Sequence, residues 1–322
     1  MKNVLITGAA GFIGANLTRE LVKRNFEVNI LIRTTSNLWR LADIKDEIIM
    51  HNVDLKDNKK LTDVVHNINP SYIFHLATYG SYPRIQTDDK KILETNILGT
   101  YNLLKATLDI HYKCFINTGS SSEYGIKDKP MKESDVLEPN TAYGVSKVTS
   151  SLLCRHFAKK YEKPIITLRP FSVYGYYEEA FRLIPEVIIK CIKQKDVHLT
   201  SGEQKRDYLF IEDIIDAYIK TMENPNKLGL IMNVSSGQDV TVKEIANLIH
   251  KLINSKNELF FGKKKKELFE TNVCWRADIE VIKKELKWKP KTSLIDGLKK
   301  TITWFKENLV IYEKNRSCNY KN

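Results

Sequence analysis

The sequence lacks the features that mark membrane-spanning, secreted and disulfide-rich proteins. No apolar run in its 322 residues reaches the roughly 18 residues that span a bilayer. The segment 1–3 leads directly into an apolar strand, so we expect no signal peptide. The cysteines form no Cys-x-x-Cys pair, which argues against a zinc site and a disulfide framework. They are Cys114, Cys154, Cys191, Cys274 and Cys318. We therefore expect a cytoplasmic protein with no membrane partner and no metal site.

Acidic residues are also in short supply. The chain has 39 Asp and Glu against 51 Lys and Arg, which gives a formal net charge of +12. Such an excess can indicate nucleic-acid binding, but the densest basic run, residues 263–266, has no interleaved aromatics and is typical of a solvated loop. We favour attraction for small anionic molecules and expect no nucleic-acid partner. The hydrophobic content of 42% is enough for a sizeable core.

A glycine-rich turn at residues 7–14 follows the apolar run 4–6 and precedes a helical pattern at residues 15–23. Strand, turn and helix in this order are typical of a dinucleotide site, because backbone N–H groups and the helix N-terminus favour a pyrophosphate. The glycines are Gly8, Gly11 and Gly14, a wider spacing than Gly-x-Gly-x-x-Gly. The context therefore carries the prediction more than the spacing does.

The residues after the second predicted strand, 26–32, bear on the choice of cofactor. A carboxylate there binds the ribose 2′-hydroxyl, whereas a basic residue accommodates a 2′-phosphate. This chain has Arg33 and no acid in the segment 33–37. Arg33 can pair with the phosphate or stack on adenine, or it is simply a solvent-facing strand end. We favour NADP(H), with NAD(H) as the alternative.

Apolar runs and helical periodicities alternate along the first half of the chain. Strands are predicted at residues 4–6, 26–32, 47–53, 72–77 and 113–117. Helices are predicted at residues 15–23, 61–68, 89–108 and 142–160. The alternation predicts an α/β fold with a parallel sheet covered on both faces. Ligands of such sheets bind beyond the carboxyl ends of the strands.

Tyr143 and Lys147 stand four residues apart at the start of a predicted helix and share one face. A nearby ammonium favours the phenolate and lowers the pKa of a tyrosine from about 10. Tyr143 can then exchange a proton with a sugar hydroxyl or ketone near neutral pH. Ser120, in a serine cluster after the strand at 113–117, can hold the same oxygen. We predict that these three residues are catalytic.

Taken together, the motifs resemble the extended short-chain dehydrogenases/reductases, in the branch of NAD(P)-dependent nucleotide-sugar epimerases, dehydratases and reductases. The matching segments are 7–14, 54–55, 75–77, 96, 120–125, 143–147, 168–175, 205–208, 277–278 and 286–290. The resemblance implies a Rossmann-type doubly wound parallel sheet with a smaller C-terminal substrate-binding lobe. It places the NAD(P)-binding domain at residues 1–170, an interwoven substrate lobe at 171–312 and a frayed tail at 313–322.

The resemblance also assigns roles around the cofactor. Lys147 would bind the nicotinamide ribose, Asp54 and Leu55 would contact the adenine side, and Ala77 the middle of the cofactor. The residues expected to bind the cofactor are Gly8, Gly11, Phe12, Ile13, Gly14, Arg33, Ser36, Asp54, Leu55, Leu76, Ala77, Tyr143 and Lys147.

A nucleotide-diphosphate sugar is the substrate that the resemblance implies. Arg206 would reach the diphosphate, a task that suits a bidentate guanidinium, and Arg276 would supply a second contact. The loop with Tyr79, Tyr82 and Arg84 would contact the sugar. The residues expected to bind substrate are Tyr79, Ser121, Ser122, Arg206 and Arg276. The helices at 96–108 and 143–160 would form a homodimer interface.

The segment after Ser120 separates the reactions of this family. Its 4,6-dehydratases carry a carboxylate pair or a Glu directly after that position, whereas this chain has Ser121 and Ser122, with Glu123 one place later. A dehydratase needs acid/base groups beyond the tyrosine, so we rank it third. We rank NADPH-dependent reduction of a 4-keto-6-deoxyhexose nucleotide first, with Tyr143 as the acid. An NAD-dependent 4-epimerase is the alternative, and a non-catalytic nucleotide-binding regulator is the alternative from another class.

Overall fold

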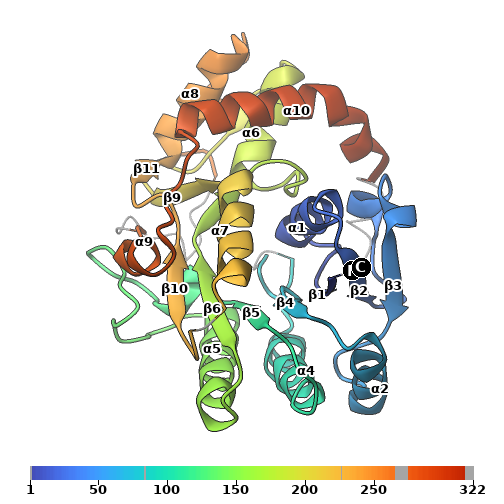
Figure 1. Ribbon diagram of the computed structural model, residues 1–322. Helices are drawn as coiled ribbons and strands as arrows, with labels where there is room; N and C mark the ends of the chain where they lie inside the picture. The colour runs from blue at the N-terminus through green and yellow to red at the C-terminus, as the bar shows by residue number, and fades with distance from the viewer. Residues whose placement is uncertain (1, 83–84, 226, 265–274, 316–322) are drawn as a thin grey trace.

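A computed structural model describes residues 2–82, 85–225, 227–264 and 275–315 of the chain (Figure 1). The expectations for Arg84, for Cys274, for the end of the lysine run and for residues 316–322 lie outside the described residues.

A seven-stranded parallel sheet forms the centre of the molecule, with strand order β10-β6-β5-β4-β1-β2-β3. Its strands are β1 (Asn3–Thr7), β2 (Glu27–Ile32), β3 (Ile48–Asn52), β4 (Tyr72–His75), β5 (Cys114–Thr118), β6 (Ile165–Pro170) and β10 (Ile231–Val234). Strands β4, β5 and β6 are buried along their whole length, as expected where helices cover both faces. The predicted fold class is confirmed.

Two layers of helices enclose this sheet (Figure 1). On one face α1 (Phe12–Lys23) packs against α7 (Ile211–Glu223). The other face is covered by α2 (Asn58–Ile68), α4 (Gly99–Ala106) and α5 (Ala142–Lys160), which pack side by side. Since the winding reverses at β1, the ends of β1, β4 and β5 open into one crevice, where ligands of such sheets bind.

The long helix predicted at residues 89–108 is interrupted by a π-helical turn. It consists of α3 (Asp89–Leu93), the π turn η3 (Glu94–Leu98) and α4. The turn contains Asn96, whose amide binds both the N–H and the carbonyl of Tyr79 at 2.8 Å and reaches Ser146 Oγ at 2.8 Å. Asn96 thereby ties the loop after β4 to α5, and π turns of this kind occur often at functional sites.

The second lobe sits over one end of the sheet (Figure 1). Its helices are α6 (Leu183–Ile192), α8 (Val242–Ile253), α9 (Glu280–Leu286) and α10 (Leu294–Asn315). Its strands form one sheet, β11-β9-β7, and one pair, β12-β8, and they are β7 (Ser172–Tyr174), β8 (Val197–His198), β9 (Lys205–Phe210), β11 (Asp239–Thr241) and β12 (Leu259–Phe260). Strand β10 comes from the second half of the chain but completes the central sheet, so the two halves interweave.

The last described helix runs into the segment predicted as a tail. The sequence predicts a frayed tail at residues 313–322, of which the structure describes residues 313–315, and α10 continues to Asn315. Tyr312 is buried against Trp39, Trp304 and Phe305, and Lys193 Nζ binds Glu313 at 2.5 Å. These contacts hold the helix in place as far as the first residues of the polar segment.

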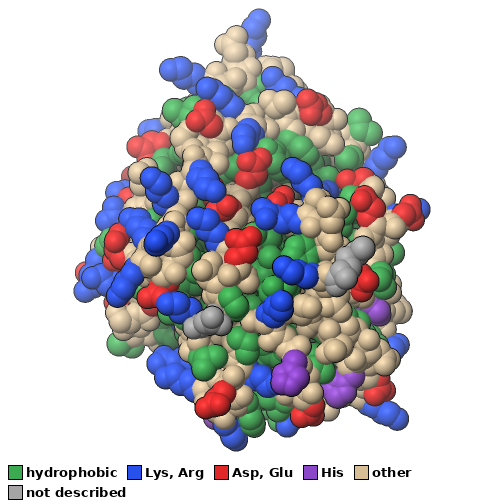
Figure 2. Space-filling view, in the orientation of Figure 1, with side chains coloured by type: hydrophobic (Ala, Val, Ile, Leu, Met, Phe, Trp, Pro, Cys, Tyr) green, Lys and Arg blue, Asp and Glu red, His purple; other side chains and the backbone are tan. Residues whose placement is uncertain are grey.

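Charged side chains are mixed over the surface. Figure 2 shows Lys and Arg across the visible face with Asp and Glu among them. Within the described ranges, no helix is both long and apolar enough to cross a membrane.

Candidate active site

The glycine turn between β1 and α1 is folded so tightly that side chains cannot replace two of its glycines. Gly8 has φ of +76°, and a Cβ there would lie 2.5 Å from the N atom of Ala77. A Cβ at Gly14 would lie 2.1 Å from the carbonyl oxygen of Gly8. The N-cap of α1 is Gly11, with no side-chain cap, and the first turn of the helix holds no acidic residue. The free N–H groups and the helix dipole therefore suit the pyrophosphate of a dinucleotide.

A cleft of about 1180 Å³ runs from this turn across the carboxyl ends of the strands to the second lobe. It collects nearly all residues predicted from the sequence to form the site. Those lining it are Gly8, Gly11, Phe12, Ile13, Gly14, Arg33, Ser36, Asp54, Leu55, Leu76, Ala77, Ser120, Ser121, Ser122, Tyr143, Lys147 and Arg206. Segments that lie far apart in the sequence thus form one continuous surface.

Ser120, Tyr143 and Lys147 converge in the middle of the cleft. Tyr143 lies in the first turn of α5, which Thr141 caps by accepting from Gly144 N at 3.0 Å. The phenol of Tyr143 hydrogen-bonds with Ser120 and with Thr78. Lys147 is buried, and its ammonium donates to the Thr118 carbonyl. The geometry therefore places a hydroxyl beside the phenol and an amine one helical turn away.

The pKa of Tyr143 is shifted in the opposite direction from the one that the sequence predicts. The sequence predicts that Lys147 lowers the pKa of Tyr143, whereas burial raises it in the protein alone. Burial also lowers the pKa of Lys147 to about 8, against the opposing charge of Glu123. Desolvation is the largest influence on the pKa of both groups, and Lys147 directs its ammonium at the Thr118 carbonyl.

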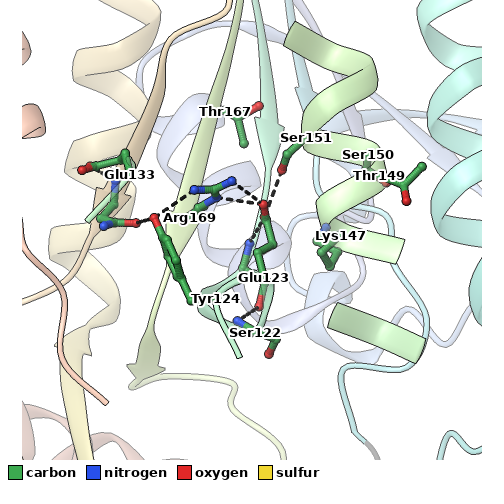
Figure 3. Close-up of polar contacts among 12 residues, drawn as sticks. Ser122, Glu123, Tyr124, Glu133, Lys147, Thr149, Ser150, Ser151, Thr167 and Arg169 are labelled. Atoms are coloured by element: carbon green, nitrogen blue, oxygen red, sulfur yellow. Dashed lines mark hydrogen bonds and ion pairs between the residues drawn. The ribbon is translucent and has the colours of Figure 1, made fainter. Parts of the chain in front are cut away.

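Glu123 points away from the cleft into the fold (Figure 3). Its Oε1 accepts from Ser120 N at 2.8 Å and from Ser151 Oγ at 2.9 Å, and its Oε2 lies 2.7 Å from Nη2 of Arg169. Both side chains of this ion pair are at most 1% exposed. Glu123 therefore anchors the Ser120 backbone and raises the pKa of Arg169 by favouring the guanidinium.

The ion pair continues into a buried network. Arg169 Nη1 donates to Tyr124 Oη at 2.9 Å, and that hydroxyl donates to Asn233 Oδ1 at 2.7 Å. The Asn233 N–H in turn donates to Glu133 Oε1 at 2.7 Å. The network joins the Ser120 loop to β6 and β10, which gives Ser120 a rigid support.

Two predicted substrate residues lie elsewhere. Among the described residues that line the cleft, neither Tyr79 nor Arg276 occurs. The Tyr79 ring lies 4.6 Å from Lys91 Nζ, and Arg276 Nη1 lies 3.6 Å from Asp239. Tyr82, named with Tyr79 for the sugar-contacting loop, does line the cleft, and so does Trp275, the neighbour of Arg276. A shift of one or three residues in an irregular loop is enough to exchange which side chain faces the ligand.

Two further residues of the cleft, Trp275 and Glu178, carry no role in the sequence prediction, whereas Arg182 is expected either to contact the nucleotide or to face solvent. Trp275 Nε1 donates to Ser121 Oγ at 3.1 Å, and the Arg206 guanidinium lies 5.4 Å from the Trp275 ring. Glu178 and Arg182 line the cleft from the segment before α6. No local spacing marks these residues, since each faces the site through contacts with distant segments. His75, at the end of β4, is buried. Its Nδ1 lies 2.7 Å from Thr7 Oγ1 and its Nε2 lies 2.8 Å from Thr100 Oγ1, so both ring nitrogens are hydrogen-bonded within the fold.

Comparison with known proteins gives a consistent result. A dTDP-glucose 4,6-dehydratase of Haemophilus influenzae is 27% identical over 332 residues, covering 95% of this chain and 98% of the relative. The structure of a UDP-glucose 4-epimerase from Thermotoga maritima with UDP-glucose has a TM-score of 0.88, 25% identity and coverage of 95% and 99%. That of a UDP-glucuronic acid 4-epimerase from Bacillus cereus, with UDP-glucuronic acid and NAD, has a TM-score of 0.83, 26% identity and the same coverage.

The sequence profile of the NAD dependent epimerase/dehydratase family matches residues 4–235, which span the glycine turn, Tyr143, Lys147 and Arg206. Relatives and solved structures match over nearly the whole chain, so the second lobe is shared as well. The chain belongs to the NAD-dependent epimerase/dehydratase family, and it is an enzyme that acts on nucleotide sugars with an NAD(P) cofactor.

Proposed function

We propose that this enzyme is an NAD-dependent 4-epimerase of a nucleotide sugar. The observation that carries the proposal is the position of Glu123. Ser121 and Ser122 occupy the places where dehydratases of the family carry carboxylates, and the next acid is locked in the Arg169 ion pair. The 4-epimerases among the similar structures support the same choice. We therefore place the 4-epimerase, which ranks second on the sequence alone, above the NADPH-dependent reductase, which ranks first on it.

The proposed reaction uses the three residues at the centre of the cleft. A bound NAD supplies the hydride acceptor and, in its oxidised form, a positive ring. Tyr143 would take the proton of the sugar 4-hydroxyl as the C4 hydride leaves and return it after the 4-keto sugar has presented its other face. Ser120 holds the same oxygen through its hydroxyl, and Lys147 holds the nicotinamide ribose. Arg206, beside Trp275, receives the diphosphate.

Reduction of a 4-keto-6-deoxyhexose nucleotide with NADPH is the second candidate, because Arg33 favours it. Arg33 is exposed at the adenine end of the cleft, and its N–H donates to Ser36 Oγ at 2.9 Å. The segment 33–37 has no carboxylate to bind a ribose 2′-hydroxyl. In the epimerase, the guanidinium would stack on adenine.

We expect purified protein to release NAD on denaturation, in a ratio near one per chain. An epimerase regenerates its cofactor in each turnover and has no need to exchange it. Chromatography of the released nucleotide, followed by an assay of UDP-glucose and UDP-galactose interconversion, tests this expectation. An empty site that prefers NADPH over NADH on refilling would contradict it. Loss of NADPH absorbance with 4-keto-6-deoxy sugar nucleotides would then identify the reductase.

We also propose that the enzyme is a homodimer joined through η3, α4 and α5. These elements carry exposed apolar side chains on the outer face of the sheet, where single exposed residues are common but a group indicates an interface. They are Leu98, Tyr101, Val145 and Leu152, at 52%, 42%, 43% and 48% exposure.

Leu152→Glu is expected to convert the dimer into a monomer, because a charge in an apolar interface is desolvated without a partner. Light scattering on a sizing column should give a mass falling from twice the 37.3 kDa chain mass to that mass. The control is Val310→Glu, since Val310 is also an exposed apolar residue, at 56% against 48% for Leu152, but lies on α10. A wild-type monomer, or an unchanged mass in Leu152→Glu, would rule out this interface.

A further inference from the structure

Glu178 is a buried carboxyl group whose contacts, from Arg182 and the Gly175 N–H, leave one of its two oxygens unpaired. It lies between β7 and α6, lines the cleft and is 5% exposed. Its Oε1 is 3.5 Å from Arg182 Nε, which is a long contact to a half-exposed side chain. Its Oε2 is buried and has no hydrogen-bond partner among the described residues. Leaving a buried acceptor unpaired costs stability, so such a group in a binding cleft indicates a donor that arrives with the ligand.

The charges around Glu178 leave it short of positive compensation. The guanidinium of Arg40 lies 2.7 Å from Glu179 and is paired with that carboxylate. Burial raises the pKa of Glu178 to about 7, and the charge of Glu179 raises it further against the effect of Arg182. The titratable and charged groups that face this region from the neighbouring elements are Arg40, Tyr82, Tyr177, Glu179, Arg182, Arg206, Tyr208 and Tyr312.

Arg182 connects this carboxyl group to the reacting end of the cleft. Its charge acts on Tyr143 as well as on Glu178 and Tyr208. Tyr82, Glu178 and Tyr208 line the same cleft as Tyr143 and Arg206, so they are available to the substituents of a sugar bound there.

We propose that Glu178 selects the sugar: its Oε2 accepts a hydrogen bond from a hydroxyl of a neutral hexose carried on UDP, and its charge excludes a hexuronate. This inference rests on the proposed function, because it assumes a nucleotide sugar in the cleft. A hydroxyl donor pairs the orphaned oxygen, whereas a sugar carboxylate would add a second negative charge in a site of low dielectric constant. Repulsion of the wrong substrate is an effective source of specificity.

Calorimetric titration of the enzyme with UDP-glucose, UDP-glucuronate and UDP tests the proposal. At pH 8 we expect the wild type to bind UDP-glucose at least about tenfold more tightly than UDP-glucuronate. Glu178→Gln and Glu178→Ala should reduce this ratio about tenfold, mainly by tightening UDP-glucuronate, and leave UDP affinity unchanged. At pH 6 the wild-type ratio should fall towards that of Glu178→Gln, because the carboxyl group is then protonated.

A matched control is Glu186→Gln. Glu186 also lines the cleft, but Lys190 and Lys264 bind it at 2.9 Å, so its charge is compensated and the ratio should not change. Folding is checked by the melting temperature of Glu178→Gln at pH 8. It should equal or exceed that of the wild type, since a neutral amide costs less to bury than an unpaired carboxylate.

The outcomes separate this inference from the proposed function. Wild-type preference for UDP-glucuronate, or an unchanged ratio in both Glu178 variants, would overturn the inference while UDP binding and 4-epimerisation stand. The expected ratios without any 4-epimerisation would overturn the function and keep the inference. Absence of UDP binding would overturn the inference, because it names a UDP-sugar, and would leave the 4-epimerase function to be tested with other nucleotide sugars.

Discussion

Tyr143→Phe is expected to lower kcat for the sugar-nucleotide reaction by about 10²- to 10⁴-fold, the usual contribution of a positioned acid/base. The phenol is the group that hydrogen-bonds with Ser120 and Thr78 in the cleft. Phenylalanine keeps the aromatic ring but lacks the hydroxyl group that would carry the proton. KM and NAD affinity should change little, since the glycine turn and Arg206 remain in place. Steady-state kinetics and titration with NADH measure the two effects separately.

The matched control for this experiment is Tyr218→Phe. Tyr218 is fully buried near Tyr143, and its hydroxyl lies 2.7 Å from Thr118 Oγ1, but it is not among the described residues that line the cleft. Removing the Tyr218 hydroxyl should cost one hydrogen bond and leave kcat at the wild-type magnitude. Equal losses in both variants would assign the effect to packing. Full activity of Tyr143→Phe would exclude the tyrosine as the acid/base and assign the proton transfer to another group of the cleft.

Local sequence patterns were sufficient for the framework of the site. The glycine turn, the Tyr143–Lys147 pair and the serine cluster after β5 are each short segments whose conformation is set within a few residues. Their convergence follows from topology, because the ends of neighbouring parallel strands meet at one edge of a sheet. The assignment of individual roles to these residues stays a prediction.

The remaining features depend on contacts between distant segments. Arg169 is 46 residues from Glu123, and Trp275 is 154 residues from Ser121, so no spacing in the sequence announces either pair. The pKa of Tyr143 was wrongly predicted for the same reason. The i to i+4 spacing reveals the lysine, but the burial that dominates in the protein alone comes from the whole fold.

Arg169→Met is expected to lower the free energy of unfolding by about 3 to 5 kcal/mol, the range for breaking one partner of a buried ion pair. Methionine fills much of the space of the arginine side chain but leaves the carboxylate of Glu123 buried without its counter-charge. It also removes the donor to Tyr124 Oη. Urea unfolding followed by tryptophan fluorescence measures the change, and kcat should fall as the support of Ser120 loosens.

The double variant Glu123→Gln with Arg169→Met distinguishes loss of charge balance from loss of packing. The glutamine carbonyl can still accept from Ser120 N and Ser151 Oγ, while no charge remains to be compensated. We therefore expect the double variant to be more stable than Arg169→Met alone, because replacing both ions removes most of the desolvation penalty. If the double variant loses as much stability as Glu123→Gln and Arg169→Met lose together when measured singly, the two side chains are not coupled. If Arg169→Met is as stable as the wild type, the ion pair does not hold the Ser120 loop. Recovery of stability together with kcat would show that Glu123 acts through its hydrogen bond to the Ser120 backbone rather than through its charge.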